Sequence, residues 1–213
     1  RERVYNALIT DQMEDWHRVI EEQKSKKNSL SDKELGELIN YYYGYTGWLL
    51  EEGTKKEAKS YIEETDEIID ALLLKYPDES DLYAYKAAFY AYKLNLNPLK
   101  APFLGGKSMD NIDLALEKCP KCAQGWIERG NSLFYMPKAF GGSKTGAIEA
   151  YKKAILYMEN EPANLVHNWV YLNVLMVLAQ AYEKTENMEM AKKSYEKILR
   201  IEPNFTYIRD EVF

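Results

Sequence analysis

The chain has 213 residues, of which 46% are hydrophobic, and a formal net charge of −6. This is enough apolar material for one domain or a short array of repeats. The negative charge argues against a nucleic-acid partner, because proteins that bind phosphates generally concentrate Lys and Arg. The longest apolar run, 169–182, is interrupted by Asn173 and Gln180 and is shorter than the roughly 20 residues of a membrane span. We therefore expect no transmembrane segment.

The first 31 residues carry apolar side chains at three- and four-residue spacing, the pattern of an amphipathic helix. The residues of this stripe are Val4, Leu8, Met13, Trp16 and Ile20. We expect one N-terminal helix here. Ser31 followed by Glu34 forms a capping-box pattern, which predicts that the second helix starts near Asp32.

Prolines mark the joints between the later helices, because proline cannot continue a helix interior. Four of them, 43, 42 and 41 residues apart, are Pro77, Pro120, Pro162 and Pro203. Such a period, with two amphipathic helices in each unit, is typical of an α-solenoid. We expect one all-α domain over 1–213, an α-solenoid of about four helix pairs with an extra N-terminal helix. The predicted segments are the N-terminal helix at 1–31, the pairs at 32–77, 78–120, 121–162 and 163–203, and a C-terminal cap at 204–213.

The last pair resembles a tetratricopeptide repeat (TPR) over residues 175–203. The matching positions are Leu178, Ala179, Tyr182, Ala191, Tyr195 and the closing Pro203. Ile198 stands where the family usually has Ala. In such a repeat, small residues allow the two helices to cross closely, and larger ones fill the space between pairs. Gly130 and Ala147 occupy the corresponding places in the third pair, with a longer connection between its helices.

Two glycine pairs interrupt the helical pattern and are expected between the two helices of a repeat. They are Gly105, Gly106, Gly141 and Gly142. We expect each pair to form a tight turn with positive φ, with Leu104 and Phe140 as apolar anchors beneath it. The alternative is that these connectors form a binding rim at one edge of the array. A phosphate-binding loop is excluded at the second pair, because Ser143 separates the glycines from Lys144.

Residues with catalytic or metal-binding chemistry are few. Cys119 and Cys122 form a C-P-K-C sequence, which suits an inter-helix turn better than a redox motif or half of a zinc site; in an oxidising compartment they could form a local disulfide. His17 and His167 are far apart and lack a metalloprotease context. We expect no catalytic residue, no metal, no cofactor and no enzyme activity.

The 18 Tyr residues are the stronger functional signal, since aromatic side chains occur on several faces of their helices. In TPR arrays the first helices of successive repeats line a concave groove. That register implies the groove residues Asn40, Tyr43, Tyr85, Phe89, Tyr92, Gln124, Ile127, Asn131, Phe134, Asn173, Met176 and Gln180. Tyr, Asn, Gln and Phe suit a peptide or an amphipathic small ligand, because they combine apolar area with hydrogen bonding. The alternative is that Tyr85 or Phe89 belongs to the core between repeats.

The whole chain also resembles exported TPR proteins of Gram-negative bacteria. The similarity is carried by residues 4–22, by the F-G-G connector and following helix at 140–155, and by 168–205. The connector is similar to that of periplasmic TPR subunits of TRAP-type transporters, which help to capture small organic ligands and can form homo-oligomers. The chain begins with Arg1 rather than Met, so we expect an upstream segment, either a tag or a signal peptide, to have been removed.

The resemblance implies a periplasmic or envelope-anchored protein, with a cytoplasmic location as the other alternative. We expect a non-enzymatic scaffold that binds a peptide or protein segment in the groove. The alternative is a periplasmic accessory of a solute transporter that binds a small organic ligand.

Overall fold

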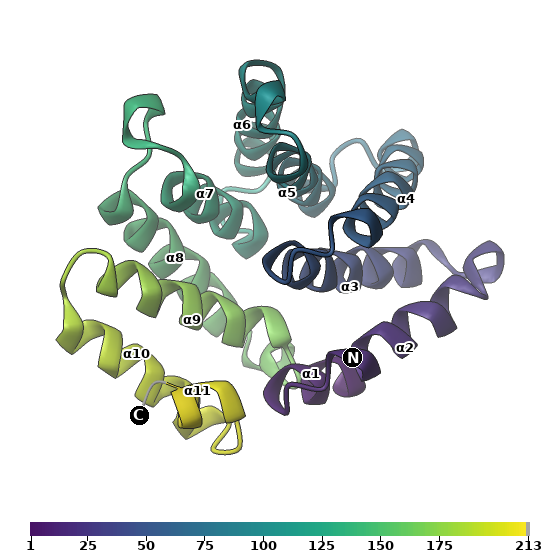
Figure 1. Ribbon diagram of the computed structural model, residues 1–213. Coiled ribbons are helices and arrows are strands. Elements are labelled where there is room, and N and C mark those ends of the chain that lie inside the picture. The colour runs from purple at the N-terminus through teal and green to yellow at the C-terminus, as the bar shows by residue number, and fades with distance from the viewer. Residues whose placement is uncertain (212–213) are drawn as a thin grey trace. The chain divides into compact units, whose positions relative to one another are not determined.

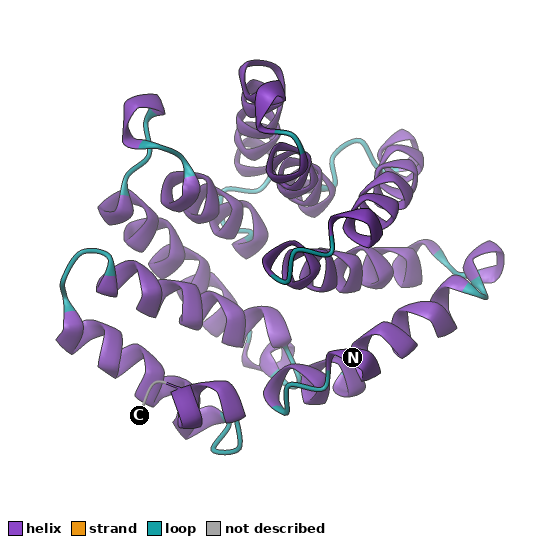
Figure 2. Ribbon diagram, viewed as in Figure 1, coloured by secondary structure: helices purple, strands orange, loops and turns teal. Residues whose placement is uncertain are grey.

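The computed structural model describes residues 1–211, and over these residues it contains eleven α-helices and no strand (Figures 1 and 2). The predicted all-α class of helix pairs is confirmed. Contacts divide the chain into two compact units. The central unit comprises residues 17–128, and the terminal unit comprises residues 1–16 together with the chain from 129 onward.

The central unit is built from helices that pack against their neighbours along the chain. They are most of α2 (Met13–Lys24), then α3 (Asp32–Glu51), α4 (Lys55–Lys75), α5 (Ser80–Leu96), α6 (Ala101–Lys118) and the start of α7 (Ala123–Tyr135). The predicted capping box at the start of α3 is present: the Ser31 hydroxyl accepts from the Glu34 amide, and the Glu34 carboxylate accepts from the Ser31 amide at 2.8 Å. Two buried serines join α5 to α6, since Ser80 donates to the carbonyl of Ala115 and Ser108 to that of Ala87.

The terminal unit is organised around α9 (Trp169–Glu183), in which eleven of 15 residues are buried. Helices α8 (Lys144–Glu159), α10 (Met188–Ile201) and α1 (Glu2–Ile9) pack against α9, and α11 (Thr206–Glu211) packs against α10. A helix that is apolar on all sides must be covered on all sides. The beginning of the chain provides part of this cover: the rings of Trp16 and Trp169 meet edge to face at 4.9 Å.

Hydrogen bonds also tie the beginning of the chain to its last helices. The Tyr5 hydroxyl donates to the Glu202 carboxylate at 3.2 Å, and the Thr206 hydroxyl donates to the carbonyl of Ile9 at 3.1 Å. The Arg1 guanidinium donates to the carbonyl of Asn164 at 2.6 Å. Burial, followed by the negative charge of Glu202, raises the pKa of Tyr5 to about 12, so this phenol stays protonated and keeps donating.

The N-terminal region holds two α-helices where one was predicted. The chain turns between Ile9 and Met13, with Asp11 in the left-handed region at φ 55°. Periodicity alone did not reveal the break, because apolar residues on both sides of it face the core.

The glycine pairs differ from each other. Gly141 has φ 101° and ends the short 3₁₀ helix Lys138–Phe140, as predicted. Gly105 and Gly106, by contrast, lie inside α6, so the predicted turn there is wrong. The chain has already been redirected at Asn97, whose side chain accepts from the Leu99 amide, in the short connector before α6.

The predicted apolar anchors also differ. Leu104 is buried, but the Phe140 side chain is 79% exposed, so its assignment as an anchor is wrong. Met136 takes the place beside the turn instead, with its sulfur near the Cβ position of Gly141 and its carbonyl against Gly142.

Substituting a glycine in the turn and a glycine inside a helix should change stability in opposite directions. A Cβ at Gly142 would lie 1.8 Å from the Met136 carbonyl oxygen, so Gly142→Ala is expected to lower the free energy of unfolding by roughly 1–3 kcal/mol. Gly105 has nothing within 4 Å of its Cβ position and lies in a helix. Gly105→Ala is therefore expected to raise the free energy of unfolding by about 0.5–1 kcal/mol. Urea unfolding of both variants measures the difference, and equal effects would contradict it.

Small residues at close helix crossings give a second prediction. Ala147 and Ala179 are both 0% exposed, so Ala147→Leu and Ala179→Leu should each cost roughly 1–3 kcal/mol by overpacking. Ala91 is exposed on α5, and Ala91→Leu is the matched control, with an expected change within about 0.5 kcal/mol. Thermal melting with no difference between these variants would show that the close crossings are placed incorrectly.

Candidate functional site

The predicted groove residues of the central unit gather where α3, α5 and the start of α7 meet. We call this group the tyrosine cluster and define it as Asn40, Tyr43, Tyr85, Phe89, Tyr92, Gln124 and Glu128. On α5 its members are spaced by four and three residues, which places them on one face of the helix.

Two hydrogen bonds join α3 to α5 in the tyrosine cluster. The Asn40 amide donates to the Tyr85 hydroxyl at 2.8 Å, and the Tyr92 hydroxyl donates to the carbonyl of Tyr43 at 3.0 Å. The second bond depends on Gly47, because a Cβ there would lie only 3.0 Å from the Tyr92 oxygen. The absence of a side chain at Gly47 therefore allows Tyr92 to reach the α3 backbone.

Ring contacts complete the aromatic part of the cluster. Tyr43 meets Tyr85 edge to face at 5.5 Å and stacks with Tyr92 at 5.9 Å. Phe89 meets Tyr92 edge to face at 5.4 Å. Tyr43 and Phe89 are buried, whereas Tyr85 and Tyr92 keep part of their surface exposed. The two half-exposed tyrosines, with Asn40, are therefore the members available to a ligand.

Glu128 is a member of the cluster that the sequence reasoning missed. Only 4% of it is exposed, and its carboxylate accepts from the Gln124 amide at 2.9 Å and from the Tyr43 hydroxyl. A buried carboxylate needs such donors, because an ionised group without partners is costly away from water. The signal was available in the sequence: Glu128 lies four residues after Gln124, on the same face of α7.

The Tyr43 and Tyr85 phenols stay protonated near neutral pH. Burial raises the pKa of Tyr43 well above its usual value, and the charge of Glu128 raises it further. Burial also raises the pKa of Tyr85, and the charge of Asp81 adds to this, while the hydrogen bond from Asn40 opposes it. The exposed part of the cluster therefore offers aromatic surface, hydroxyls and an amide, which suit recognition through apolar contact and hydrogen bonding.

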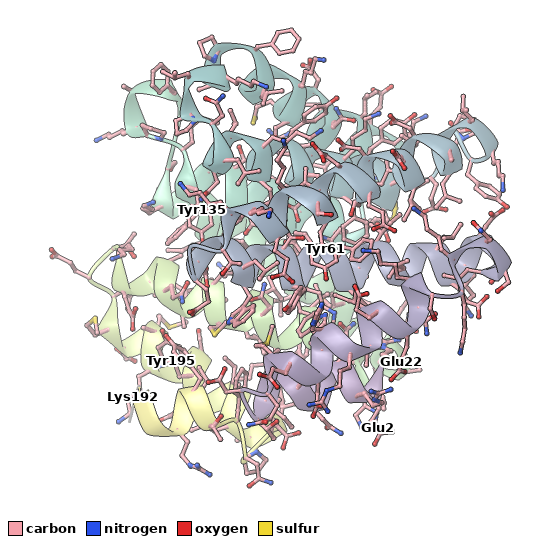
Figure 3. All side chains as sticks on the ribbon, turned by 45° about the vertical axis from the view of Figure 1, so that its right-hand side comes forward. Glu2, Glu22, Tyr61, Tyr135, Lys192 and Tyr195 are labelled. Carbon is pink, nitrogen blue, oxygen red and sulfur yellow. A yellow bond between two sulfur atoms is a disulfide. The ribbon has the colours of Figure 1, made fainter. Side chains whose placement is uncertain are left out.

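The other predicted groove residues lie elsewhere. Ile127 is buried in the central unit. In the terminal unit, the side-chain oxygen of Asn131 accepts from Tyr151 at 2.9 Å, which directs it toward α8. Phe134 is buried beside Tyr135, which Figure 3 labels at the end of α7, and Lys144 lies over its ring. Half-exposed residues form one stripe on α9, namely Asn173, Met176 and Gln180.

A shallow groove of ≈ 630 Å³ lies between α8 and α10 in the terminal unit, and no sequence pattern predicted it. Its floor includes Leu175 and Leu178, and five Lys and Arg side chains line it. Lys197 and Tyr171 both donate to the Glu159 carboxylate within it. Burial alone would raise the pKa of Glu159, but these bonds outweigh it and the net pKa is lowered. Ion pairs within this groove already neutralise part of the positive charge of its Lys and Arg side chains.

The cysteines and histidines are held by local contacts. Cys119 and Cys122 form a disulfide with Cα atoms 5.3 Å apart, at the turn between α6 and α7. His17 stacks on Tyr45 at 5.5 Å, and His167 lies 5.4 Å from the ring of Tyr5.

Within residues 1–211 no three His, Cys, Asp or Glu side chains are grouped so that they could hold a metal ion. None of the helices in that range is both long and apolar enough to cross a membrane.

A double-mutant cycle tests the hydrogen bond between α3 and α5. Tyr85→Phe and Asn40→Leu are each expected to destabilise the fold, with a coupling energy of about 0.5–1.5 kcal/mol between them. Tyr92→Phe removes a different bond, so its effect should add to that of Asn40→Leu within about 0.5 kcal/mol. Chemical unfolding of the six proteins (wild type, three single variants and two double variants) measures both couplings. Additivity of the first pair would mean that this bond does not form.

Comparison with known proteins supports the fold more strongly than any activity. A tetratricopeptide-repeat family model matches residues 172–205, which cover most of α9 and all of α10. No curated protein gives a significant sequence match. Among solved structures, the HusA haemophore from Porphyromonas gingivalis is similar, with a TM-score of 0.56 and 18% sequence identity over 80% of this chain and 94% of that one. At this identity the likeness shows a shared fold, and the TPR match is shown for the last helix pair.

Proposed function

We propose that this protein is a non-enzymatic scaffold of the cell envelope that binds a peptide or protein segment at the tyrosine cluster. The observation that carries the proposal is the half-exposed surface of Asn40, Tyr85 and Tyr92 between α3 and α5. Rigid aromatic rings give contact area at low cost in side-chain entropy, and the side-chain amide of Asn40 can form hydrogen bonds with a peptide backbone. The repeat matched at residues 172–205 supports this class of function, because TPR proteins commonly bind protein segments.

The envelope location is the second part of the proposal. The Cys119–Cys122 disulfide supports it, since disulfides persist mainly in oxidising compartments. The resemblance of residues 4–22 and 140–155 to exported TPR proteins supports it as well. Fractionation of the native host, followed by thiol trapping, would test it: a reduced protein found in the cytoplasmic fraction would contradict an envelope role.

Selection from a random peptide library tests the binding surface. Peptides retained by the wild type should bind Tyr85→Ala at least about tenfold more weakly in fluorescence anisotropy. The matched control is Tyr90→Ala, because Tyr90 is a half-exposed tyrosine on the same helix that lies beneath Lys93 and Lys107 instead. Its affinity should stay within about threefold of the wild type. Equal losses in the two variants, or no peptide retained, would contradict the proposal.

The second candidate is a periplasmic accessory protein that binds a small organic ligand. The fold shared with the HusA haemophore favours it, and tyrosine is among the residues that can ligate haem iron. Haemin is therefore the probe. Saturable haemin binding followed by absorbance, lost in Tyr85→Ala and kept in Tyr90→Ala, would favour this function over the scaffold.

A further inference from the structure

Two segments, each made of a joint between helices and the residues beside it, share a sequence pattern and lie outside the tyrosine cluster. We call these two segments the connectors. Residues 98–107 read PLKAPFLGGK and residues 137–144 read PKAFGGSK. Each contains, in the same order, a proline, a Lys-Ala pair, a phenylalanine, two glycines and a lysine. The backbones differ, since the first glycine pair is helical and the second forms a turn. Common backbone geometry therefore does not explain the shared pattern.

Both connectors expose large apolar side chains. Leu99 is 92% exposed and Phe103 is 65% exposed at the start of α6, in the central unit. Phe140 is 79% exposed and Tyr135 is 64% exposed around the connector between α7 and α8, in the terminal unit. Groups of exposed apolar side chains usually mark a contact site, because water is a poor solvent for them. With most of their surface exposed, these side chains project outward and do not line a recess.

The charge around these side chains is positive, although the whole chain carries −6. Residues 97–109 contain Lys100 and Lys107 and no acidic residue. Residues 131–148 contain Lys138 and Lys144 and no acidic residue, and the Lys144 ammonium donates to the carbonyl of Phe134, which leaves Lys138 as the outward charge there. Within residues 1–211, neither Lys100 nor Lys138 forms an ion pair. The Lys107 ammonium lies 4.4 Å from the centre of the Phe103 ring, so charge and apolar surface are adjacent.

We propose that each connector is a contact site for a membrane surface that carries anionic lipids. The exposed Leu99, Phe103 and Phe140 side chains enter the boundary between head groups and acyl chains, and Lys100, Lys107 and Lys138 meet the lipid phosphates. A lipid surface fits better than a folded partner, because projecting apolar tips need no complementary recess in a fluid interface.

Vesicle binding tests this inference. The wild type should co-sediment with vesicles of phosphatidylethanolamine and phosphatidylglycerol, much less with pure phosphatidylcholine, and less as salt is raised. The combined variant Leu99→Ser, Phe103→Ser, Phe140→Ser should bind at least about tenfold more weakly. Variants of the first connector alone and of Phe140 alone then show how much each contributes. Because the changed residues are exposed, melting temperatures should not change.

The matched control is Leu74→Ser, since Leu74 is 88% exposed at the end of α4 and lies outside both connectors. Its vesicle binding should equal that of the wild type. Tyr85→Ala should also bind vesicles normally, so failure of the peptide-binding proposal is distinguishable from failure of this one. The inference is overturned if the wild type does not bind the anionic vesicles, or if the combined connector variant binds them as well as Leu74→Ser does.

Discussion

The terminal unit depends on the need to cover most of the surface of α9. Eleven of its 15 residues are buried, and the half-exposed Asn173, Met176 and Gln180 lie on a single stripe. One antiparallel partner cannot bury such a helix, so α8, α10 and the N-terminal α1 share the task. Trp16 against Trp169 and Tyr5 against Glu202 are the consequences of this constraint. The N-terminal segment is therefore a structural part of the last helix pairs.

In the central unit, buried and partly exposed aromatic side chains of the tyrosine cluster pack against one another. The Tyr43 ring contacts Tyr85 across α3 and α5, Phe89 packs against Tyr92 within α5, and the Glu128 carboxylate accepts from Gln124 and Tyr43. This buried layer holds the half-exposed Tyr85 and Tyr92 in fixed positions. A surface of this kind loses little side-chain entropy when a ligand binds, because its rotamers are already restricted. The connectors are different, since Leu99 and Phe140 lack such support and can adapt to a fluid surface.

The sequence predicted those features that follow from local chemistry. Helix class, the Ser31 capping box, the small Ala147 and Ala179, and the positive φ of Gly141 all agree with the structure. The predictions were wrong where the local structure depends on a competing residue nearby or on a residue distant in the sequence. Asn97 and the prolines around it end α5 before the glycine pair is reached, so Gly105 stays helical. The partner of Asn131 is Tyr151 on the next helix, and the burial of Glu128 depends on Tyr43 from a distant one. Such pairings cannot be read from periodicity along one helix.

The joining of the first 16 residues to the C-terminal helices affects how the chain acquires its structure. The central unit is continuous in sequence, so all its contacts become available once residues 17–128 have been synthesised. The terminal unit is discontinuous, and α1 has no α9 to cover until nearly the whole chain exists. Closing this long loop carries an entropic cost that the already folded central unit reduces, because it shortens the flexible chain between the two ends. Nascent chains therefore hold an amphipathic N-terminal segment with its apolar side chains exposed until α9 has been synthesised.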